Sequence, residues 1–225
     1  MPNLTPEAQL REALSFLGHN AREGHSSTLA LLELQRIKPD PMGLADLVDR
    51  VERNARKSLA AIDDFMDMAG ARAQPLRSDE IDLADLLIEL VADAWSLASR
   101  HGVRVQIASS LETAPLVADR ELLASALAKL LRDAAARTPR GVDLQCALAE
   151  APGEWLIDIG DPGAPVAEPA EAIGALPWDS KRPPQERIGP GLALAQLVTQ
   201  RHGGRVEIEP KPAGGRTLRL HLPRT

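Results

Sequence analysis

The stretch "GPGLALAQLVTQRHGGRVEIEPKPAGGRTLRLHLP", Gly189 to Pro223, decides the fold because it contains one helix and two strands in order. The segment "GLALAQLVTQRHGG" is predicted to form a helix that ends at its paired glycines. The segments "RVEIEPK" and "RTLRLHLP" alternate apolar and polar residues, as half-buried strands do, and "PAGG" joins them as a turn. A helix followed by neighbouring strands predicts a sheet with helices on one face.

The residues before this stretch continue the mixture of helices and strands. The segment "IDLADLLIELVADAWSLASRHG" is predicted as a helix, with Asp82 as its N-cap and Gly102 at its end. The strand "VRVQIAS" follows, then an amphipathic helix from Asp119 to Pro139, then the paired strands "GVDLQCALAE" and "GEWLIDIGD". This mixed order predicts an α+β sandwich.

Two further helices are predicted ahead of the sandwich. Apolar or small residues recur in steps of four and three in two runs, which is the pattern of a coiled-coil seam. The first seam comprises Leu10, Leu14, Leu17, Ala21, Gly24, Thr28 and Leu31, and the second comprises Leu44, Val48, Val51, Ala55, Leu59, Ile62, Met66 and Ala69. The segment "KPDPMG", residues 38–43, separates the runs because two prolines and a glycine do not continue a helix. The sequence therefore predicts an antiparallel helical hairpin.

One hairpin does not cover two apolar seams well. Pairing with a second copy in a four-helix bundle covers them, so we expect a homodimer. The alternative is a monomeric hairpin packed on its own C-terminal domain. The polar segment Gly70 to Glu80 contains Pro75 and is predicted as a linker. We therefore expect a helical-hairpin dimerisation domain at residues 1–74 and an α/β sandwich domain at residues 75–225.

Composition excludes several classes of partner and compartment. The net charge of −6 argues against nucleic acid, because nothing here neutralises a row of phosphates. Cys146 is the single cysteine, so there is no disulfide framework and a reducing compartment is expected. No apolar run approaches the roughly 20 residues that span a bilayer, and the N-terminus does not have the pattern of a signal peptide. We expect a cytoplasmic protein, or the cytoplasmic part of a membrane sensor whose N-terminal segment lies outside this sequence.

The order of elements and four local motifs resemble the sensor histidine kinases of two-component signalling, over nearly the whole chain. "FLGHNAREGHSSTLALLELQR", residues 16–36, is similar to that family's phospho-acceptor box. "LLASALAKLLRDAAARTPRG", residues 122–141, is similar to its ATP-site helix, and "WLIDIGDPGAPV", residues 155–166, to the strand and turn that carry the adenine-binding aspartate. Gly189 to Pro223 matches the second glycine box and the sheet after it, and this last match is the most specific.

The resemblance implies ATP and Mg²⁺ as cofactors and the receiver domain of a response regulator as partner. It implies that His19 accepts a phosphoryl group and passes it to an aspartate on the regulator, with the neutral imidazole nitrogen as nucleophile. His19 lies outside the seam set by Leu17 and Ala21, which agrees with the need to face two protein partners in solvent. Arg22 belongs to the same box, and His25 is expected to be an ordinary surface residue.

The phospho-acceptor box departs from the family pattern. Asn20 replaces the acidic residue that follows the histidine. An amide cannot act as a general base, and the loss of a positioned base typically costs on the order of 10²–10⁴ in rate. Glu23 and Gly24 replace the Ser/Thr–Pro pair that bends the helix in relatives.

The ATP-site helix departs further. The resemblance places Lys129 and Asp133 at the two asparagine positions of the family, and Ala136 at the position of the lysine that follows. The second asparagine orients Mg²⁺ in relatives, so the oxygen-bearing Asp133 is a candidate magnesium ligand that also adds negative charge beside a triphosphate. Arg132 or Arg137 is a substitute for the missing lysine. The alternative is that Lys129, Arg132 and Asp133 form a solvated helix face without a ligand.

The two glycine boxes are partly kept. Asp161 is the candidate acceptor for the adenine amino group, whereas Pro165 replaces the second glycine of the first box. Residues 168–188 correspond to the family's mobile lid, and backbone N–H groups at the start of the helix that follows suit an anion. The positions that the resemblance assigns to nucleotide binding are Lys129, Asp133, Asp161, Gly163, Gly189, Gly191 and Leu192.

Three hypotheses about function follow. In the first, the chain is a histidine kinase core whose ATP-dependent autophosphorylation of His19 is weakened. In the second, it is a pseudokinase or histidine phosphotransferase that takes its phosphoryl group from a regulator or another kinase and does not use ATP. In the third, it is a dimeric scaffold that binds a regulator without phosphoryl chemistry.

Overall fold

The computed structural model describes residues 6–37, 43–109, 111–163, 189–211 and 214–224. In the first of these ranges, the side chains of residues 6–13, 15, 16 and 19–21 are outside the description. The described residues divide into two compact units, with the break between Ala69 and Gly70. Each unit is therefore treated by itself.

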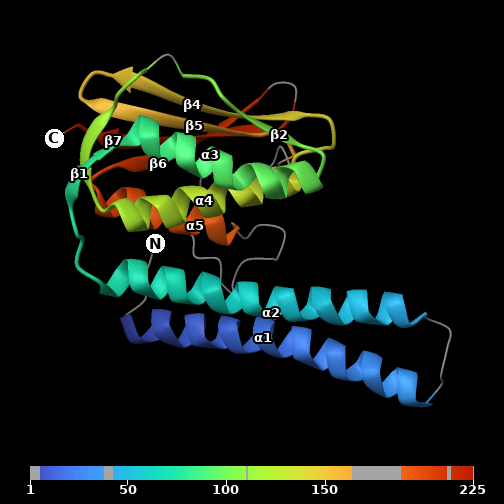
Figure 1. Ribbon diagram of the computed structural model, residues 1–225. Coiled ribbons are helices and arrows are strands. Elements are labelled where there is room, and N and C mark those ends of the chain that lie inside the picture. The colour runs from blue at the N-terminus through green and yellow to red at the C-terminus, as the bar shows by residue number, and fades with distance from the viewer. Residues whose placement is uncertain (1–5, 38–42, 110, 164–188, 212–213, 225) are drawn as a thin grey trace. The chain divides into compact units, whose positions relative to one another are not determined.

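The first unit is a helical hairpin of α1 (Pro6–Ile37) and α2 (Leu44–Ala73), as predicted from the two seams (Figure 1). The helices pack closely at Gly24, which is buried. A Cβ atom on Gly24 would lie 2.1 Å from Ser58 Oγ and 2.8 Å from the carbonyl oxygen of Asn54, so only glycine fits there. Beside this point Lys57 pairs with Glu23 across the hairpin at 3.2 Å.

The α2 seam is not the face that α1 covers around Gly24. That face has the small and polar residues Asn54 and Ser58, and Ser58 is 1% exposed. The apolar seam lies beside it and remains largely open to solvent within one chain. Its exposed members are Leu44, Val48, Leu59, Ile62 and Met66. The sequence pattern therefore identified an apolar stripe on α2, but this stripe is not what holds the hairpin together around Gly24.

The predicted linker from Gly70 to Glu80 is shorter than expected. Helix α2 continues to Ala73 and stops two residues before Pro75, which disfavours helical geometry in the residue before it. The first strand, β1 (Asp79–Asp82), then begins inside the expected linker. Arg201 donates hydrogen bonds to the carbonyl oxygens of Ala71 and Gln74, which satisfies backbone acceptors at the helix end.

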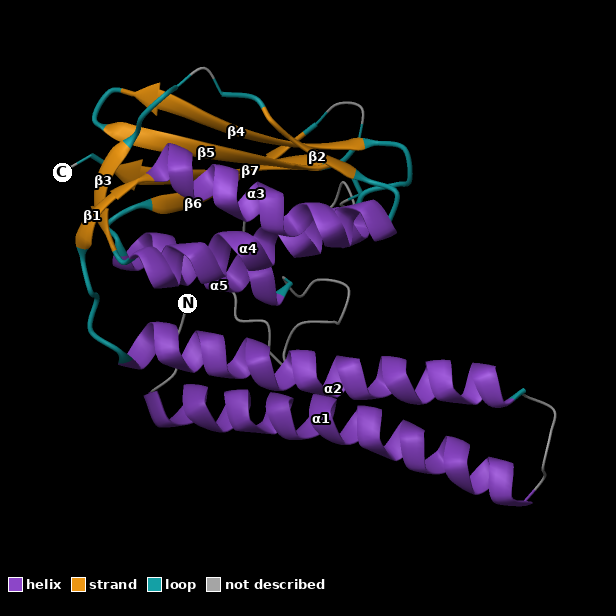
Figure 2. Cartoon of the chain, viewed as in Figure 1, coloured by secondary structure: helices purple, strands orange, loops and turns teal. Residues whose placement is uncertain are grey.

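The second unit is the predicted α+β sandwich. Its main sheet has the order β2-β4-β5-β7-β6, in which β2 is parallel to β4 and the other pairs are antiparallel. The strands are β2 (Arg104–Ile107), β4 (Asp143–Ala151), β5 (Glu154–Asp161), β6 (Arg205–Pro210) and β7 (Arg216–Pro223). The helices α3 (Leu83–Arg100), α4 (Arg120–Arg137) and α5 (Pro190–Arg201) cover one face of this sheet (Figure 2). Side chains such as Leu127, Leu130, Ile157, Ile159 and Leu218 are fully buried.

A second, two-stranded sheet was not predicted. It pairs β1 with β3 (Pro115–Ala118) in antiparallel register, Ile81 opposite Leu116. Each strand has only four residues, too few for an alternating pattern to stand out. The predicted cap is confirmed next to it, because Asp82 accepts a hydrogen bond from the backbone N–H of Ala84 at 2.8 Å.

Helix α5 begins earlier than predicted. Its first residue is Pro190 and its N-cap is Gly189, whereas the predicted helical segment begins at Gly191. Proline is favoured in the first turn because its fixed φ suits a helix and its missing N–H is not needed there. Gly191 therefore lies inside the first turn, where it is buried.

Candidate functional site

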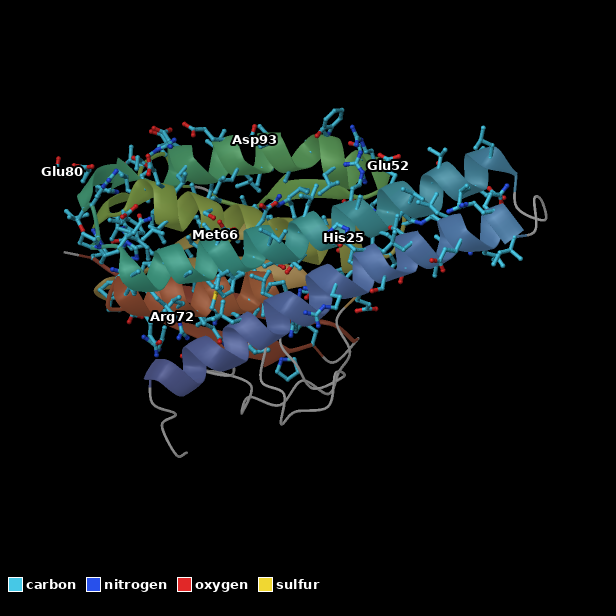
Figure 3. The ribbon with its side chains drawn as sticks, turned by 90° about the horizontal axis from the view of Figure 1, so that it is seen from below. His25, Glu52, Met66, Arg72, Glu80 and Asp93 are labelled. Carbon is cyan, nitrogen blue, oxygen red and sulfur yellow. The ribbon has the colours of Figure 1, made fainter. Side chains whose placement is uncertain are left out.

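The predicted phospho-acceptor lies in the middle of α1. His19 and Asn20 are helical, but their side chains are outside the described residues, so their orientation stays a prediction. Arg22 and Glu23 are exposed. His25 is exposed on α1, as expected for a surface residue (Figure 3).

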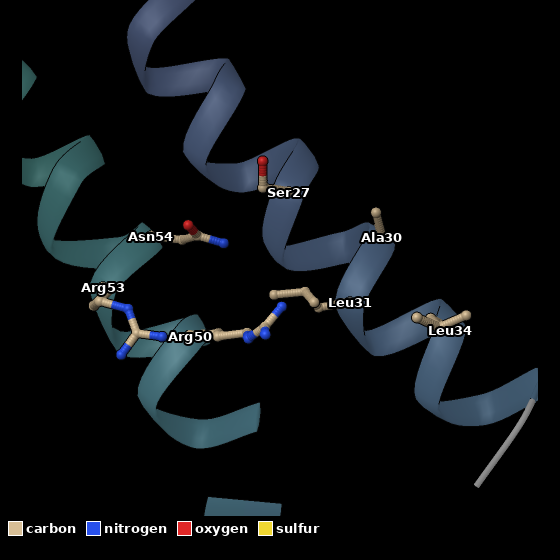
Figure 4. A pocket seen from close by; sticks show the side chains of 7 residues that line it. All are labelled: Ser27, Ala30, Leu31, Leu34, Arg50, Arg53 and Asn54. Atoms are coloured by element: carbon tan, nitrogen blue, oxygen red, sulfur yellow. The ribbon is translucent and has the colours of Figure 1, made fainter. Parts of the chain in front are cut away.

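A groove lies between α1 and α2 farther along the hairpin (Figure 4). Its volume is about 430 Å³ and it combines apolar and cationic side chains. The residues that line it are Ser27, Ala30, Leu31, Leu34, Arg50, Arg53 and Asn54. A surface of this composition suits a partner that offers apolar and acidic side chains.

The predicted adenine-binding aspartate is already bound by two arginines. Asp161 is the last residue of β5 and is 0% exposed. Arg137, in the last turn of α4, donates to Asp161 from Nη2 at 2.7 Å and from Nε at 3.2 Å. Arg216, the first residue of β7, donates from Nε at 3.1 Å and pairs through Nη2 at 3.1 Å. The carboxylate is thus neutralised inside the protein.

The two arginines differ in their surroundings. The side chain of Arg216 is 5% exposed and that of Arg137 is 34% exposed. Burial lowers the pKa of the Arg216 guanidinium, Asp161 opposes this effect, and the neighbouring charge of Arg137 adds to it. Arginine remains protonated at neutral pH in spite of such a shift, so the cluster is one anion between two cations.

Gly163 has a packing role next to this cluster. A Cβ atom at Gly163 would lie 1.7 Å from the carbonyl oxygen of Arg137, which no neighbouring backbone tolerates. The turn after β5 therefore packs directly against the end of α4. This contact is sufficient to require glycine at position 163, whether or not a nucleotide binds nearby.

The predicted phosphate end of the site also has an internal partner. The backbone N–H of Gly191 donates to Asp133 Oδ2 at 3.0 Å. A Cβ atom at Gly191 would lie 2.4 Å from the same oxygen. The carboxylate of Asp133, on α4, therefore lies at the N-terminus of α5, where an anion is favoured.

The remaining predicted positions are buried in the helical layer. Lys129 is 6% exposed and Leu192 is 2% exposed, so neither belongs to a solvated helix face. The proposed solvated face of Lys129, Arg132 and Asp133 is therefore wrong for Lys129. The expected lid, residues 168–188, and Pro165 lie outside the described residues.

In the part of the chain that the structure describes, the carboxylate and the Gly191 backbone N–H expected to bind Mg·ATP already have partners within the protein. The carboxylate expected to bind adenine is paired with two guanidinium groups, and a carboxylate occupies the expected phosphate end. No group of three or more His, Cys, Asp and Glu side chains that would hold a metal ion is present in the part of the chain that the structure describes. Cysteine chemistry is disfavoured as well, because burial and the charge of Asp158 raise the pKa of Cys146 to about 12.

Sequence reasoning identified Asp161 and Asp133 but missed what they bind. Arg216 was not predicted, and it lies 55 positions from Asp161 in the sequence. Its only signal is its place at the start of a strand directly after the two glycines of a turn. Arg137 was predicted as a substitute for the missing lysine, and it binds the carboxylate of Asp161.

Comparison with known proteins identifies the second unit. Residues 118–225 match the family described as histidine kinase-, DNA gyrase B-, and HSP90-like ATPases. The chain is 28% identical over 235 residues to the sensor protein DivL of Caulobacter vibrioides, covering 87% of this chain and 29% of DivL. It is 28% identical over 192 residues to the C4-dicarboxylate transport sensor protein DctS of Rhodobacter capsulatus, covering 83% of this chain and 28% of DctS. The chain thus spans less than a third of the length of these relatives.

Solved structures show the same fold. The histidine kinase ThkA, in complex with the response regulator protein TrrA, has a TM-score of 0.73 at 16% identity, covering 96% of this chain and 64% of that one. The Acinetobacter baumannii histidine kinase AdeS has a TM-score of 0.63 at 14% identity, covering 91% of this chain and 96% of that one. Among the described residues, no helix combines the length and apolar character needed to cross a bilayer.

Proposed function

Because the chain belongs to the histidine kinase family, we propose that it is a two-component signalling core that carries a phosphoryl group on His19. The group is exchanged with the aspartate of a response-regulator receiver domain. The proposal is supported by the position of His19 on a two-helix stem that precedes an ATPase-type sandwich. The chain works in the cytoplasm under this proposal, because receiver domains are cytoplasmic partners.

Exchange with a receiver aspartate suits the residues of this box. The imidazole nitrogen attacks phosphorus, the P–N bond forms, and the P–O bond to the aspartate breaks with its electron pair on the carboxylate. A carboxylate with an ordinary pKa of about 4 leaves without being protonated. The step therefore needs no general acid, and Asn20 is not an obstacle to it. The same step in reverse returns the phosphoryl group to the receiver.

ATP-dependent autophosphorylation is weak or absent under this proposal. The observation that carries this part is the buried Asp161 held by Arg137 and Arg216. An adenine amino group would have to reach a fully buried carboxylate that two guanidinium groups already contact, and displacing one of these groups would cost up to about 3–5 kcal/mol. This favours the pseudokinase or phosphotransferase hypothesis over the kinase hypothesis.

The groove between α1 and α2 is our candidate for receiver docking. It lies on the helix that carries His19, and Leu31, Leu34 and Arg53 offer apolar and cationic contacts. The complex of ThkA with the response regulator protein TrrA supports a receiver as the partner of this fold. A charge reversal at Arg53 is expected to slow transfer from a phosphorylated receiver without unfolding the hairpin.

The exposed stripe on α2 supports a homodimer. Leu59, Ile62 and Met66 follow one another at helical spacing, are exposed by 60%, 38% and 62%, and form a surface typical of an interface. A second copy of the hairpin would bury this stripe in a four-helix bundle. The two apolar seams therefore predict that a second copy of the chain covers this stripe.

The test is transfer of an acid-labile phosphoryl group onto the chain from receiver domains phosphorylated with a small-molecule donor, in the absence of nucleotide. We expect the label on the wild-type chain and on a His25→Ala variant, and no label on a His19→Ala variant. The two histidines lie on the same helix, so they are a matched pair. Absence of label on all three chains would leave the regulator-binding scaffold as the better hypothesis.

A further inference from the structure

The phosphate end of the pocket contains a built-in anion. Helix α5 has 12 residues and no acidic residue in its first turn, so its N-terminal N–H groups have no anionic partner from their own helix. Asp133, on α4, supplies one, because its Oδ2 accepts the hydrogen bond of Gly191 N–H at 3.0 Å. Charge-assisted bonds of this kind are stronger than neutral ones.

The glycines of the box hold this carboxylate at short range. A Cβ atom at Gly191 would meet Asp133 Oδ2 at 2.4 Å and Cγ at 3.0 Å. A Cβ atom at Gly189 would lie 3.5 Å from the same Oδ2. Glycines in a nucleotide site have no side chain, so their backbone can approach a phosphate closely. In this chain the same glycines bring the backbone close to the carboxylate of Asp133.

Asp133 also belongs to a row of alternating charges. Arg137 lies one turn later on α4, and a Cβ atom at Gly189 would be 3.9 Å from its Nη1. Arg137 in turn binds Asp161, which binds Arg216. The row of Asp133, Arg137, Asp161 and Arg216 is formally neutral, so these four side chains together offer no uncompensated positive charge to a polyphosphate.

We infer that Asp133 is an internal occupant of the expected phosphate subsite, and that its negative charge disfavours nucleotide phosphates there, in addition to the pairing of Asp161 at the adenine end. This inference relies on the proposed function only in taking the pocket as a former nucleotide site. A nucleotide phosphate at the Gly191 N–H would displace the carboxylate or lie within a few ångströms of it. At such distances two anions repel strongly in a partly desolvated site.

The test is calorimetric titration with ADP in the absence of Mg²⁺, using the full chain. In an Asp133→Asn variant the amide oxygen still accepts from Gly191 N–H, and the family's own residue is restored. In an Asp133→Ala variant the N–H is free. We expect both variants to bind ADP at least tenfold more tightly than the wild type.

Two controls separate this effect from a general change in charge or fold. Asp93, exposed on α3, gives a matched Asp93→Asn variant that loses the same charge and should bind ADP no better than the wild type (Figure 3). Tripolyphosphate probes the phosphate end without adenine and should bind the two Asp133 variants better than the wild type. Circular dichroism establishes that each variant is folded.

The direction in which the Asp133 substitutions change ADP affinity decides whether Asp133 disfavours nucleotide binding. Unchanged or weaker ADP binding by both folded Asp133 variants overturns it. Tight binding of Mg·ADP by the wild type, lost in Asp133→Asn, also overturns it and identifies Asp133 as a magnesium ligand. Neither result affects the test of phosphoryl transfer from a receiver, because that transfer uses no nucleotide. The proposed function and the role of Asp133 can therefore be disproved independently.

Discussion

Asp161 and Asp158 lie three positions apart on β5, yet their ion pairs differ in kind. Asp161 is fully buried between Arg137 and Arg216. Asp158 pairs with Arg219 at 2.7 Å, but both side chains are more than a quarter exposed. Burial decides what each pair contributes, because a buried charge that loses its partner cannot be rescued by water.

This difference gives a prediction for stability. An Asp161→Ala substitution leaves two guanidinium groups without their anion, and we expect a loss of about 3–5 kcal/mol in the free energy of unfolding. Asp158→Ala removes a solvent-screened pair on the same strand, and we expect a loss of less than about 1 kcal/mol. Urea unfolding of both variants measures the two costs, and equal costs would contradict the buried-cluster description.

Asp119 gives a prediction about pH. Burial opposes its ionisation, but hydrogen bonds from the backbone N–H of Arg77 and of Leu122 and the charge of His202 outweigh this effect, so the pKa of Asp119 is lowered. A lowered pKa in the folded state stabilises the protein above the unfolded pKa of about 3.9, and this stabilisation is lost as the pH falls through the folded pKa.

We therefore expect Asp119→Ala to cost about 1 kcal/mol at pH 7, as the loss of an N-cap does. The cost should shrink below about pH 4, where the wild type loses the same interaction. Urea unfolding at pH 7, 5 and 3 measures it, with Asp93→Ala as an exposed control. A cost that stays constant with pH would show that the charge of Asp119 does not matter.

Residue types near the pocket could be predicted from sequence, but their partners could not. Asp133 and Asp161 stood out because they occupy positions with a known role in a related family. Arg216 could not be paired with Asp161 because the contact depends on the register of β5 and β7, in which the two residues face each other. The register between two strands that are 55 positions apart is set by the folded sheet and cannot be read from the local sequence.

At the scale of elements, the α1–α2 crossing depends on one glycine. Gly24 contacts Ser58 and the backbone of Asn54, whereas a Cβ atom at Gly18 in the same helix would have no atom within 4 Å. Gly18→Ala should therefore raise stability by about 0.5–1 kcal/mol through backbone entropy. Gly24→Ala should lower it by about 1–3 kcal/mol through overpacking.

Thermal unfolding followed by circular dichroism at a helical wavelength measures this matched pair. The two substitutions make the same chemical change in one helix, so helix propensity cancels between them. The same sign of change for both would contradict the close approach at Gly24.

Elements with strong local signals were predicted well. The N-cap Asp82 and the alternating strands β4 and β5 are confirmed, because capping and period-two patterning act locally. The four-residue strands β1 and β3 were missed, since their pairing depends on a contact between distant segments. The face of α2 that packs against α1 around Gly24 was not predicted either, because Asn54 and Ser58 are polar and do not indicate a packing face.

At the scale of the whole molecule, the exposed stripe on α2 predicts self-association. Light scattering at micromolar concentration should give about twice the chain mass of 24.2 kDa. Leu59→Glu should shift the mass toward the monomer because it places a charge in the stripe. Ala60→Glu, exposed on another face of the same helix, is the control and should remain dimeric. A wild-type mass near that of one chain would contradict the dimer.

We propose that the chain carries a phosphoryl group for receiver domains, while charged groups of the chain itself occupy its expected nucleotide site. The most direct measurement is the rate at which the wild-type chain acquires phosphohistidine from Mg·ATP and, separately, from phosphorylated receivers, followed by intact mass. We predict acquisition from a receiver and little or none from ATP over the same time. Rapid phosphorylation of His19 by Mg·ATP alone would contradict the account.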